Sequence, residues 1–183
     1  MGHRLSKIYT RTGDAGTTGL GDGSRTAKNS PRVAAMGDVD ELNSLLGVIL
    51  CEDLPADVRE LFIGIQHDLF DLGGELCIPG STLLKATQPA RLEAAIDHFN
   101  ADLGPLKEFI LPGGNRAAAL THLARTVCRR GERLVVGLAA EESVADAGRQ
   151  YLNRLSDLLF VLGRYLNKVA GGSDVLWQKG KNA

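Results

Sequence analysis

The residues with the clearest potential for chemistry are arginines gathered in one short stretch. Arg125, Arg129 and Arg133 are spaced four residues apart, a step that places side chains along one face of a helix. Arg130 adds a fourth guanidinium, and Glu132 is the one acid between them. Like charges at this spacing repel one another, and a polyphosphate would relieve that repulsion. The pattern fits an anion site, and it fits an ordinary exposed helix face equally well.

The amino-terminal segment is the second candidate, because it combines glycines with threonine hydroxyls in the run TRTGDAGTTGLG from residue 10. Glycines let backbone N–H groups converge on an anion, and Arg11 and Lys28 add cationic partners. The run is not a Walker A loop, because no GK[ST] ending follows it. Taken alone, such a segment is more often a flexible tail than a phosphate site.

The remaining polar residues do not single out a mechanism. Asp40 and its acidic neighbours Asp38 and Glu41 suit a solvated face, a general base or ion pairing with an arginine, and Asn153 suits a polar helix face. The histidines show no metal-ligand spacing, so no protein-bound metal site is expected. A GxSxG motif is also missing, which disfavours hydrolase chemistry through a serine nucleophile.

Apolar residues at three- and four-residue steps predict five helices that would position these groups. Ser30 and Pro31 form a helix-start signal. The helices are expected over about 30–51, 55–77, 89–102, 116–139 and 146–169, with a short strand at 7–10 and no run long enough for a sheet. The expected fold is all-α, an up-and-down bundle over residues 30–170. Residues 1–29 would form an amino-terminal segment of the same single domain, and 171–183 a carboxy-terminal tail.

Composition limits the partners. The 183 residues carry a net charge of −1, which offers no global field for nucleic acid or an anionic membrane. No apolar run is long enough for a membrane span, and no cleaved secretory signal is expected at the start of the chain. Three cysteines without CxxC spacing are typical of reduced thiols in a cytoplasmic protein.

Four motifs together resemble one known family. IYTRTGDAGTTGL with Lys28 and SPRVAAMGDVDELNSLLG, then FILPGG from residue 109, ARTVCRRGER from 124 and YLNRLSDLLFVLGRYLN from 151 occur in family order. They are similar to the PduO-type ATP:cob(I)alamin adenosyltransferases over nearly the whole chain. The resemblance implies a five-helix bundle, a homotrimer with active sites between subunits, and transfer of the 5′-deoxyadenosyl group of ATP to the cobalt of reduced cobalamin, with release of triphosphate.

The resemblance also implies roles for individual residues. Phe109 would fill the space beneath the corrin and displace the lower axial base, while Asp40 and Arg125 would form a salt bridge between neighbouring subunits. The nucleotide would be bound by Thr10, Arg11, Thr12, Gly13, Thr18, Gly19, Lys28, Arg129, Arg130, Gly131, Glu132, Arg133 and Asn153. Mg²⁺ would be held mainly by ATP. A cob(II)alamin reductase and adenosylcobalamin-dependent enzymes are the expected protein partners.

Two other interpretations remain open from the residues alone. One is a non-catalytic helical sensor that binds ATP or another polyphosphate through the same loop and arginines. The other is an assembly protein whose charged faces make oligomer contacts. Phe109 separates them from the enzyme, because a nucleotide sensor has no need for an aromatic residue in a loop bounded by Pro and Gly.

Overall fold

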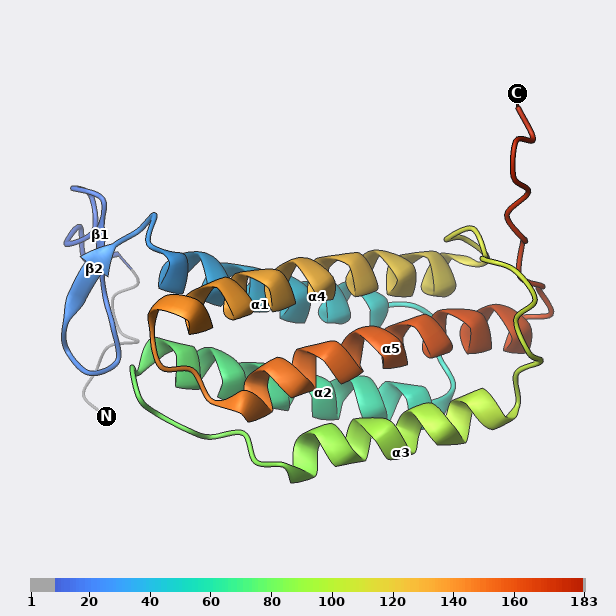
Figure 1. The fold of residues 1–183 in the computed structure, drawn as a ribbon, viewed down its shortest axis with the longest axis horizontal. Helices are drawn as coiled ribbons and strands as arrows, with labels where there is room; N and C mark the ends of the chain where they lie inside the picture. Colours follow the sequence, from blue (N-terminus) through green and yellow to red (C-terminus); the bar gives the residue numbers. More distant parts are fainter. Residues whose placement is uncertain (1–8, 183) are drawn as a thin grey trace.

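The chain is an up-and-down bundle of five helices, with a small two-stranded hairpin at one end (Figure 1). The structure, a computed structural model, describes residues 9–182. The helices are α1 (Pro31–Ile49), α2 (Ala56–Cys77), α3 (Thr87–Ala101), α4 (Arg116–Glu141) and α5 (Asp146–Val169). Helix α1 packs between α2 and α4, and α5 packs between α4 and α3. The all-α bundle expected from the sequence is confirmed.

The helix boundaries follow local capping chemistry. Ser30 caps α1 through its hydroxyl, which accepts a hydrogen bond from the Val33 N–H, and Pro31 occupies the first turn as predicted. Three boundaries differ from expectation by two residues. Helix α1 ends at Ile49 rather than at about 51, α3 begins at Thr87 rather than at Pro89, and α4 continues to Glu141. A proline is tolerated in the first turn of a helix, so Pro89 did not mark the start of α3.

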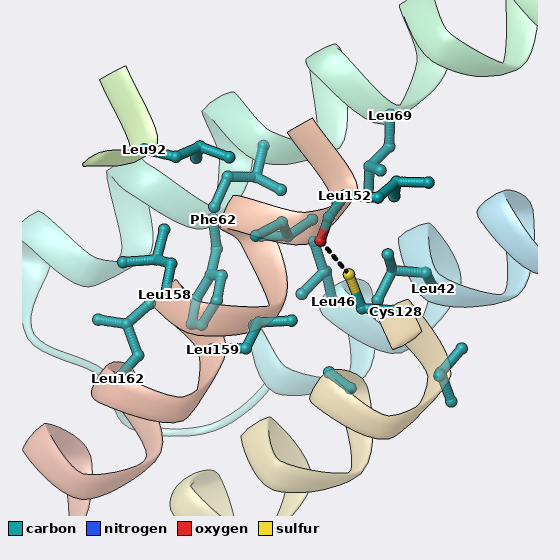
Figure 2. Close-up of a cluster of buried hydrophobic side chains, with 14 of the residues drawn as sticks. Leu42, Leu46, Phe62, Leu69, Leu92, Cys128, Leu152, Leu158, Leu159 and Leu162 are labelled. Atoms are coloured by element: carbon teal, nitrogen blue, oxygen red, sulfur yellow. Dashed lines mark hydrogen bonds between the residues drawn. The ribbon is translucent and has the colours of Figure 1, made fainter. Parts of the chain in front are cut away.

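The core is formed by the apolar stripes of all five helices. Phe62 of α2 lies among leucines of α5, and Leu46 of α1 faces the same interior (Figure 2). The Cys128 thiol of α4 donates a hydrogen bond to the Leu152 carbonyl oxygen at 3.2 Å (Figure 2). Burial raises the pKa of this thiol well above its usual value, so Cys128 stays protonated and acts as a packing group.

One buried polar cluster ties three helices together inside this core. The hydroxyl of Tyr151 on α5 donates to the Asp68 carboxylate on α2 at 2.7 Å. Arg91 of α3 donates to the same carboxylate oxygen. Burial raises the pKa of Asp68, although the hydrogen bond from Tyr151 and the charge of Arg91 oppose the shift.

Within residues 9–182, no helix is both long and apolar enough to cross a membrane.

The amino-terminal segment contains a hairpin that the sequence did not predict. Strands β1 (Thr17–Gly19) and β2 (Arg25–Ala27) pair antiparallel. Of the strand expected at 7–10, residues 7 and 8 lie outside the described part of the chain, and residues 9 and 10 are not in a strand. Three-residue strands are too short to show the alternation that reveals a sheet. The Gly21 N–H donates to the Cys77 carbonyl oxygen at 2.8 Å, which fixes the hairpin beside the end of α2.

Candidate functional site

Phe109 and Arg125, two of the three residues expected to act in catalysis, line the same pocket. This pocket of about 570 Å³ lies between the connection from α3 to α4, α4 itself and Phe160 of α5. The segment 104–114 is called the Phe109 loop below. The side chain of Phe109 is 77% exposed, so it is available to a ligand rather than built into the core.

Arg125 has an unmet hydrogen-bonding capacity at this pocket. Its Nε atom is buried and has no hydrogen-bond partner among the described residues. Burial, and secondarily the charge of Arg129, lower the pKa of Arg125. A buried N–H without an acceptor costs free energy that a bound acceptor would recover. The pocket therefore pairs an open aromatic ring with a cation suited to an acidic or carbonyl group.

The carboxy-terminal segment, for which no role was predicted, pairs with the Phe109 loop. Leu176 forms an antiparallel bridge with Ile110. The Trp177 N–H donates to the Phe109 carbonyl oxygen at 2.7 Å, and the two rings lie edge to face. The single tryptophan of the chain was the available signal, but a lone aromatic residue in a glycine-rich tail does not reveal its partner.

Arg164 of α5 anchors both segments to the bundle. Its side chain is 8% exposed, and its Nε donates to the Asp174 carboxylate at 2.7 Å. Its Nη2 donates to the Gly104 carbonyl oxygen at 3.0 Å. One buried guanidinium thus holds the beginning of the Phe109 loop and the beginning of the paired carboxy-terminal strand.

Asn167, one turn further along α5, packs closely against the other end of the Phe109 loop. A Cβ atom built on Gly114 would lie 2.6 Å from the Asn167 side chain, and one on Gly172 would lie 2.4 Å from it. Gly114 also has φ of +106°, a backbone conformation that favours glycine. The Asn115 side chain donates to the Leu166 carbonyl oxygen and accepts from the Ala118 N–H, so the loop passes directly into the capped start of α4.

His122 lies buried on α4, three residues before Arg125. Its ring meets Phe160 edge to face and rests against Gly163, where an added Cβ would lie 2.9 Å from Nε2. The Nδ1 atom has no hydrogen-bond partner within residues 9–182. Burial lowers the pKa of His122, the charge of Arg125 lowers it further, and Asp174 opposes the shift. The imidazole is therefore neutral, and it packs against Phe160, which lines the pocket.

The arginines of α4 fall into two groups. Arg130 donates to Asp38 and to Glu41, so two carboxylates of α1 already neutralise it. Arg129 and Arg133 are exposed, and within the described residues neither side chain has a carboxylate partner. All three arginines were predicted to bind the nucleotide, but Arg129 and Arg133 are open to an anion while Arg130 joins α1 to α4.

The other predicted nucleotide contacts on α4 and α5 lie close together. Asn153 donates from its side chain to the Glu132 carboxylate at 3.0 Å. Arg154 donates to the Asn153 side-chain oxygen at 2.6 Å and to Glu93 of α3 at 2.7 Å. Gly131 lies where α4 meets α1, with Asp38 3.7 Å from an added Cβ.

The predicted phosphate-binding residues of the amino-terminal segment also cluster. The Lys28 ammonium lies over Gly13, 3.2 Å from the position that a Cβ would take. The hydroxyls of Thr10 and Thr12 are hydrogen-bonded at 2.8 Å, and Arg11 between them has φ of +61°. The remaining two residues of the predicted set, 18 and 19, lie on β1.

Asp40 lies apart from Arg125 in the single chain. It is exposed on α1, at a pocket of about 490 Å³ between α1 and α2. Phe70 of α2, which was not predicted as a site residue, lines this pocket and is 73% exposed. The salt bridge between Asp40 and Arg125 was expected to join two subunits, so it stays a prediction.

The candidate residues thus form groups that one chain does not bring together. The hairpin lies at one end of the bundle and the Phe109 loop at the other (Figure 1). Arg125 itself lies roughly 24 Å along the helix axis from Glu141, the residue that ends α4 on the hairpin side. The exposed face of α4 with Arg129 and Arg133 lies between the two groups.

Comparison with known proteins identifies the family. The model of the family described as cobalamin adenosyltransferase matches residues 8–166. A cobalamin adenosyltransferase from Cupriavidus metallidurans is 68% identical over 180 residues, covering 98% of both chains. A corrinoid adenosyltransferase from Bacillus subtilis is 44% identical, covering 94% of this chain and 93% of that protein.

Solved structures agree with this result. A phenylalanine-to-histidine variant of the PduO-type ATP:corrinoid adenosyltransferase from Lactobacillus reuteri, complexed with cobalamin and ATP, has a TM-score of 0.91 and 36% identity. The match covers 97% of this chain and 100% of that one. The resemblance found in the sequence is confirmed: the chain belongs to the cobalamin adenosyltransferase family and is a transferase of the PduO type.

Proposed function

We propose that this protein transfers the 5′-deoxyadenosyl group of ATP to the cobalt of cob(I)alamin, with the corrin seated over Phe109. The observation that carries this proposal is the pocket in which the open ring of Phe109 lies beside Arg125, whose buried Nε has no partner among the described residues. The apolar ring of Phe109 beneath the corrin would exclude an axial base from the lower face of the cobalt. The cation beside it suits the polar rim of the corrin or a carboxylate from a neighbouring subunit.

The reaction explains which side chains the site contains. Co(I) is itself the nucleophile: it attacks C5′ of ATP, the Co–C bond forms, and the C5′–O bond breaks with its electron pair leaving on triphosphate. No serine, cysteine or lysine nucleophile is required. The protein must hold the two substrates in line and stabilise the charge that grows on the leaving group. Arg129, Arg133 and Lys28 are assigned to that charge.

The threonine-rich loop and Lys28 are assigned to the triphosphate. Gly13 and Lys28 are in contact, and the hydroxyls of Thr10 and Thr12 are exposed beside them. Mg²⁺ suits this set, because hydroxyls, phosphate oxygens and water are the hard oxygen ligands that the ion takes. Within residues 9–182, no three His, Cys, Asp or Glu side chains gather as a metal site. We assign Mg²⁺ mainly to the phosphates of ATP, where it would neutralise charge on the leaving group.

The active unit is proposed to be a homotrimer, with each site shared between subunits. The hairpin and the Phe109 loop lie at opposite ends of one chain, so a neighbouring subunit must supply one of the two groups. The exposed Phe70 and Asp40 on the α1–α2 face suit such a contact. Light scattering should give three times the chain mass of 19.5 kDa, and a fully active monomer would contradict the shared site.

The free thiols of Cys51, Cys77 and Cys128 suit the reducing cytoplasm.

The enzyme assay separates this proposal from a nucleotide sensor. Protein is incubated with ATP and chemically reduced cobalamin, and the corrin absorbance is followed. Conversion to the spectrum of adenosylcobalamin, with triphosphate released, supports the transferase. Binding of ATP without any spectral change would support the sensor instead. A cob(II)alamin reductase replaces the chemical reductant in the proposed cellular reaction, and adenosylcobalamin-dependent enzymes receive the product.

A further inference from the structure

Arg25 on β2 makes two hydrogen bonds to residues far from it in sequence. Its Nη2 donates to the carbonyl oxygen of Thr12 and to the hydroxyl of Thr17, both at 2.7 Å. We propose that Arg25 is a positioning residue for the triphosphate: it fixes the loop at residues 11–16 in the shape that binds phosphate, without contacting ATP itself. This inference rests on the proposed function, in which that loop binds ATP.

The first hydrogen bond sets the direction of one peptide group. The described residues contain no cis peptide bond, and in a trans peptide the C=O and the following N–H point in opposite directions. Because the Thr12 carbonyl points at Arg25, the Gly13 N–H points away from it. Within residues 9–182, that N–H makes no hydrogen bond. Arg25 therefore keeps a free donor turned outward beside the Lys28 ammonium, which lies against Gly13.

The second hydrogen bond joins the guanidinium to the start of β1. Thr17 pairs with Ala27 in the hairpin, and its carbonyl oxygen lies 3.1 Å from the position of a Cβ on Gly13. Arg25 thus connects the middle of the loop to the hairpin at a place where a side chain on Gly13 would be crowded by Thr17 and Lys28. Anionic ligands bind well where N–H donors are held in advance in such a concave arrangement.

The loop needs this support because little else holds it. Its residues are mostly exposed, and Arg11 is in a left-handed conformation that a non-glycine residue rarely adopts. Apart from Arg25, the Lys28 N–H donates to the Gly16 carbonyl oxygen at 2.9 Å, and the side chains of Thr12 and Arg11 contact their exposed neighbours Thr10 and Tyr9. Without Arg25, ATP must order the loop when it binds, and that cost weakens its affinity.

A double-mutant cycle on ATP affinity tests the proposal. Calorimetric dissociation constants are measured for wild type, Arg25→Ala, Thr17→Val and the double variant. Loss of both hydrogen bonds in Arg25→Ala should weaken ATP about tenfold, and loss of one in Thr17→Val about threefold. In the Arg25→Ala background, Thr17→Val should have no further effect, because its partner is already gone. The KM for ATP should rise with little change in kcat at saturating ATP.

Arg116→Ala is the matched control. It removes the same charge from an exposed arginine, which pairs with Glu52 at the opposite end of the bundle, and should leave ATP affinity unchanged. Two results would overturn the proposal: Arg25→Ala that binds ATP as wild type does, or effects of Arg25→Ala and Thr17→Val that multiply. Multiplied effects would mean that Arg25 attracts ATP by its own charge.

The amide resonance of Gly13 gives a readout that does not depend on ATP. In the protein without nucleotide, Arg25→Ala and Thr17→Val should both shift this resonance, and Arg116→Ala should not. A Gly13 resonance that stays in place in Arg25→Ala would also overturn the proposal. Wild-type protein that binds no ATP would refute the proposed function instead, and the Gly13 resonance would still show whether Arg25 fixes the loop.

Discussion

Trp177 and Phe109 meet edge to face, with ring centroids 6.4 Å apart and an interplanar angle of 72°. Such a pair is favourable because the positive edge of one ring approaches the negative face of the other. Together with the hydrogen bond from the Trp177 N–H to the Phe109 carbonyl oxygen, it holds the Phe109 ring on one side. Phe109 thus remains largely exposed while its direction is fixed.

Phe109→Ala should damage corrinoid chemistry and leave the fold and ATP binding intact. Removal of a ring that excludes an axial ligand should weaken the four-coordinate Co(II) state and reduce adenosylation ten- to a thousandfold, by the conversion of about 1.4 kcal/mol for each tenfold. Because the ring is 77% exposed, the free energy of unfolding should change by less than about 0.5 kcal/mol. The absorption band of four-coordinate Co(II) and the ATP dissociation constant are measured together. A variant with an undiminished band would remove Phe109 from this role.

Asp174→Ala should release the carboxy-terminal strand from the Phe109 loop. It leaves the guanidinium of Arg164, which is 8% exposed, without its carboxylate, at a cost of about 1–3 kcal/mol in unfolding free energy. Hydrogen exchange should become faster at the Leu111 amide, which donates to the Val175 carbonyl oxygen at 2.8 Å, and at the Trp177 amide, which donates to Phe109. Asp146→Ala is the control, because that carboxylate is 75% exposed and pairs with Arg149 on the surface. Equal amide protection in both variants would show that Arg164 does not anchor the strand.

Arg129→Ala should mainly weaken ATP binding, whereas Arg130→Ala should mainly lower stability. Arg129 is open to solvent, so its loss should weaken ATP binding with little change in stability. Arg130 is engaged by Asp38 and Glu41, so its loss should lower the free energy of unfolding, though only modestly because the pairs are partly exposed. Urea unfolding and ATP titration of both variants test this division. If Arg130→Ala mainly reduces ATP affinity, the original assignment of Arg130 to the nucleotide is the better one.

Stability should fall as the pH drops below about 6.5, in part because of His122. Burial lowers the pKa of His122 below its usual 6.5, so the unfolded chain takes up a proton between 6.5 and the folded pKa while the folded protein does not. His122→Leu should therefore reduce the loss of unfolding free energy between pH 7.5 and 5.5. An unchanged pH dependence in His122→Leu would show that the imidazole titrates alike in both states.

The helices could be predicted because their signals are local. The apolar stripes with Ser30 and Pro31 marked α1, and α5 begins and ends at the expected residues. The strands of the hairpin could not be predicted, because three residues show no period, and their pairing depends on a turn with Gly23 at φ of +90°.

The site was predicted as a set of residues, and its internal arrangement was not. Spacing placed Arg125, Arg129 and Arg133 on one face of a helix, but it could not show that the adjacent Arg130 finds acids on α1. The contact of Trp177 with Phe109 was equally hidden, because it joins residues far apart in sequence through main-chain hydrogen bonds. Such contacts depend on the packed bundle rather than on any pattern in the tail.

Asn167 has a consequence for how sequences of this kind can diverge. Its side chain occupies the space that a Cβ would take at Gly114 and also at Gly172. At Gly172 the Asn167 side chain is the nearest obstacle and the Asn167 carbonyl oxygen, 3.0 Å from the Cβ position, is a second and milder one, whereas Gly114 is also restricted by its own positive φ. A larger residue at position 172 therefore becomes acceptable only after position 167 has become smaller. The order of substitutions matters, and positions 167 and 172 should covary across homologues while position 114 stays glycine.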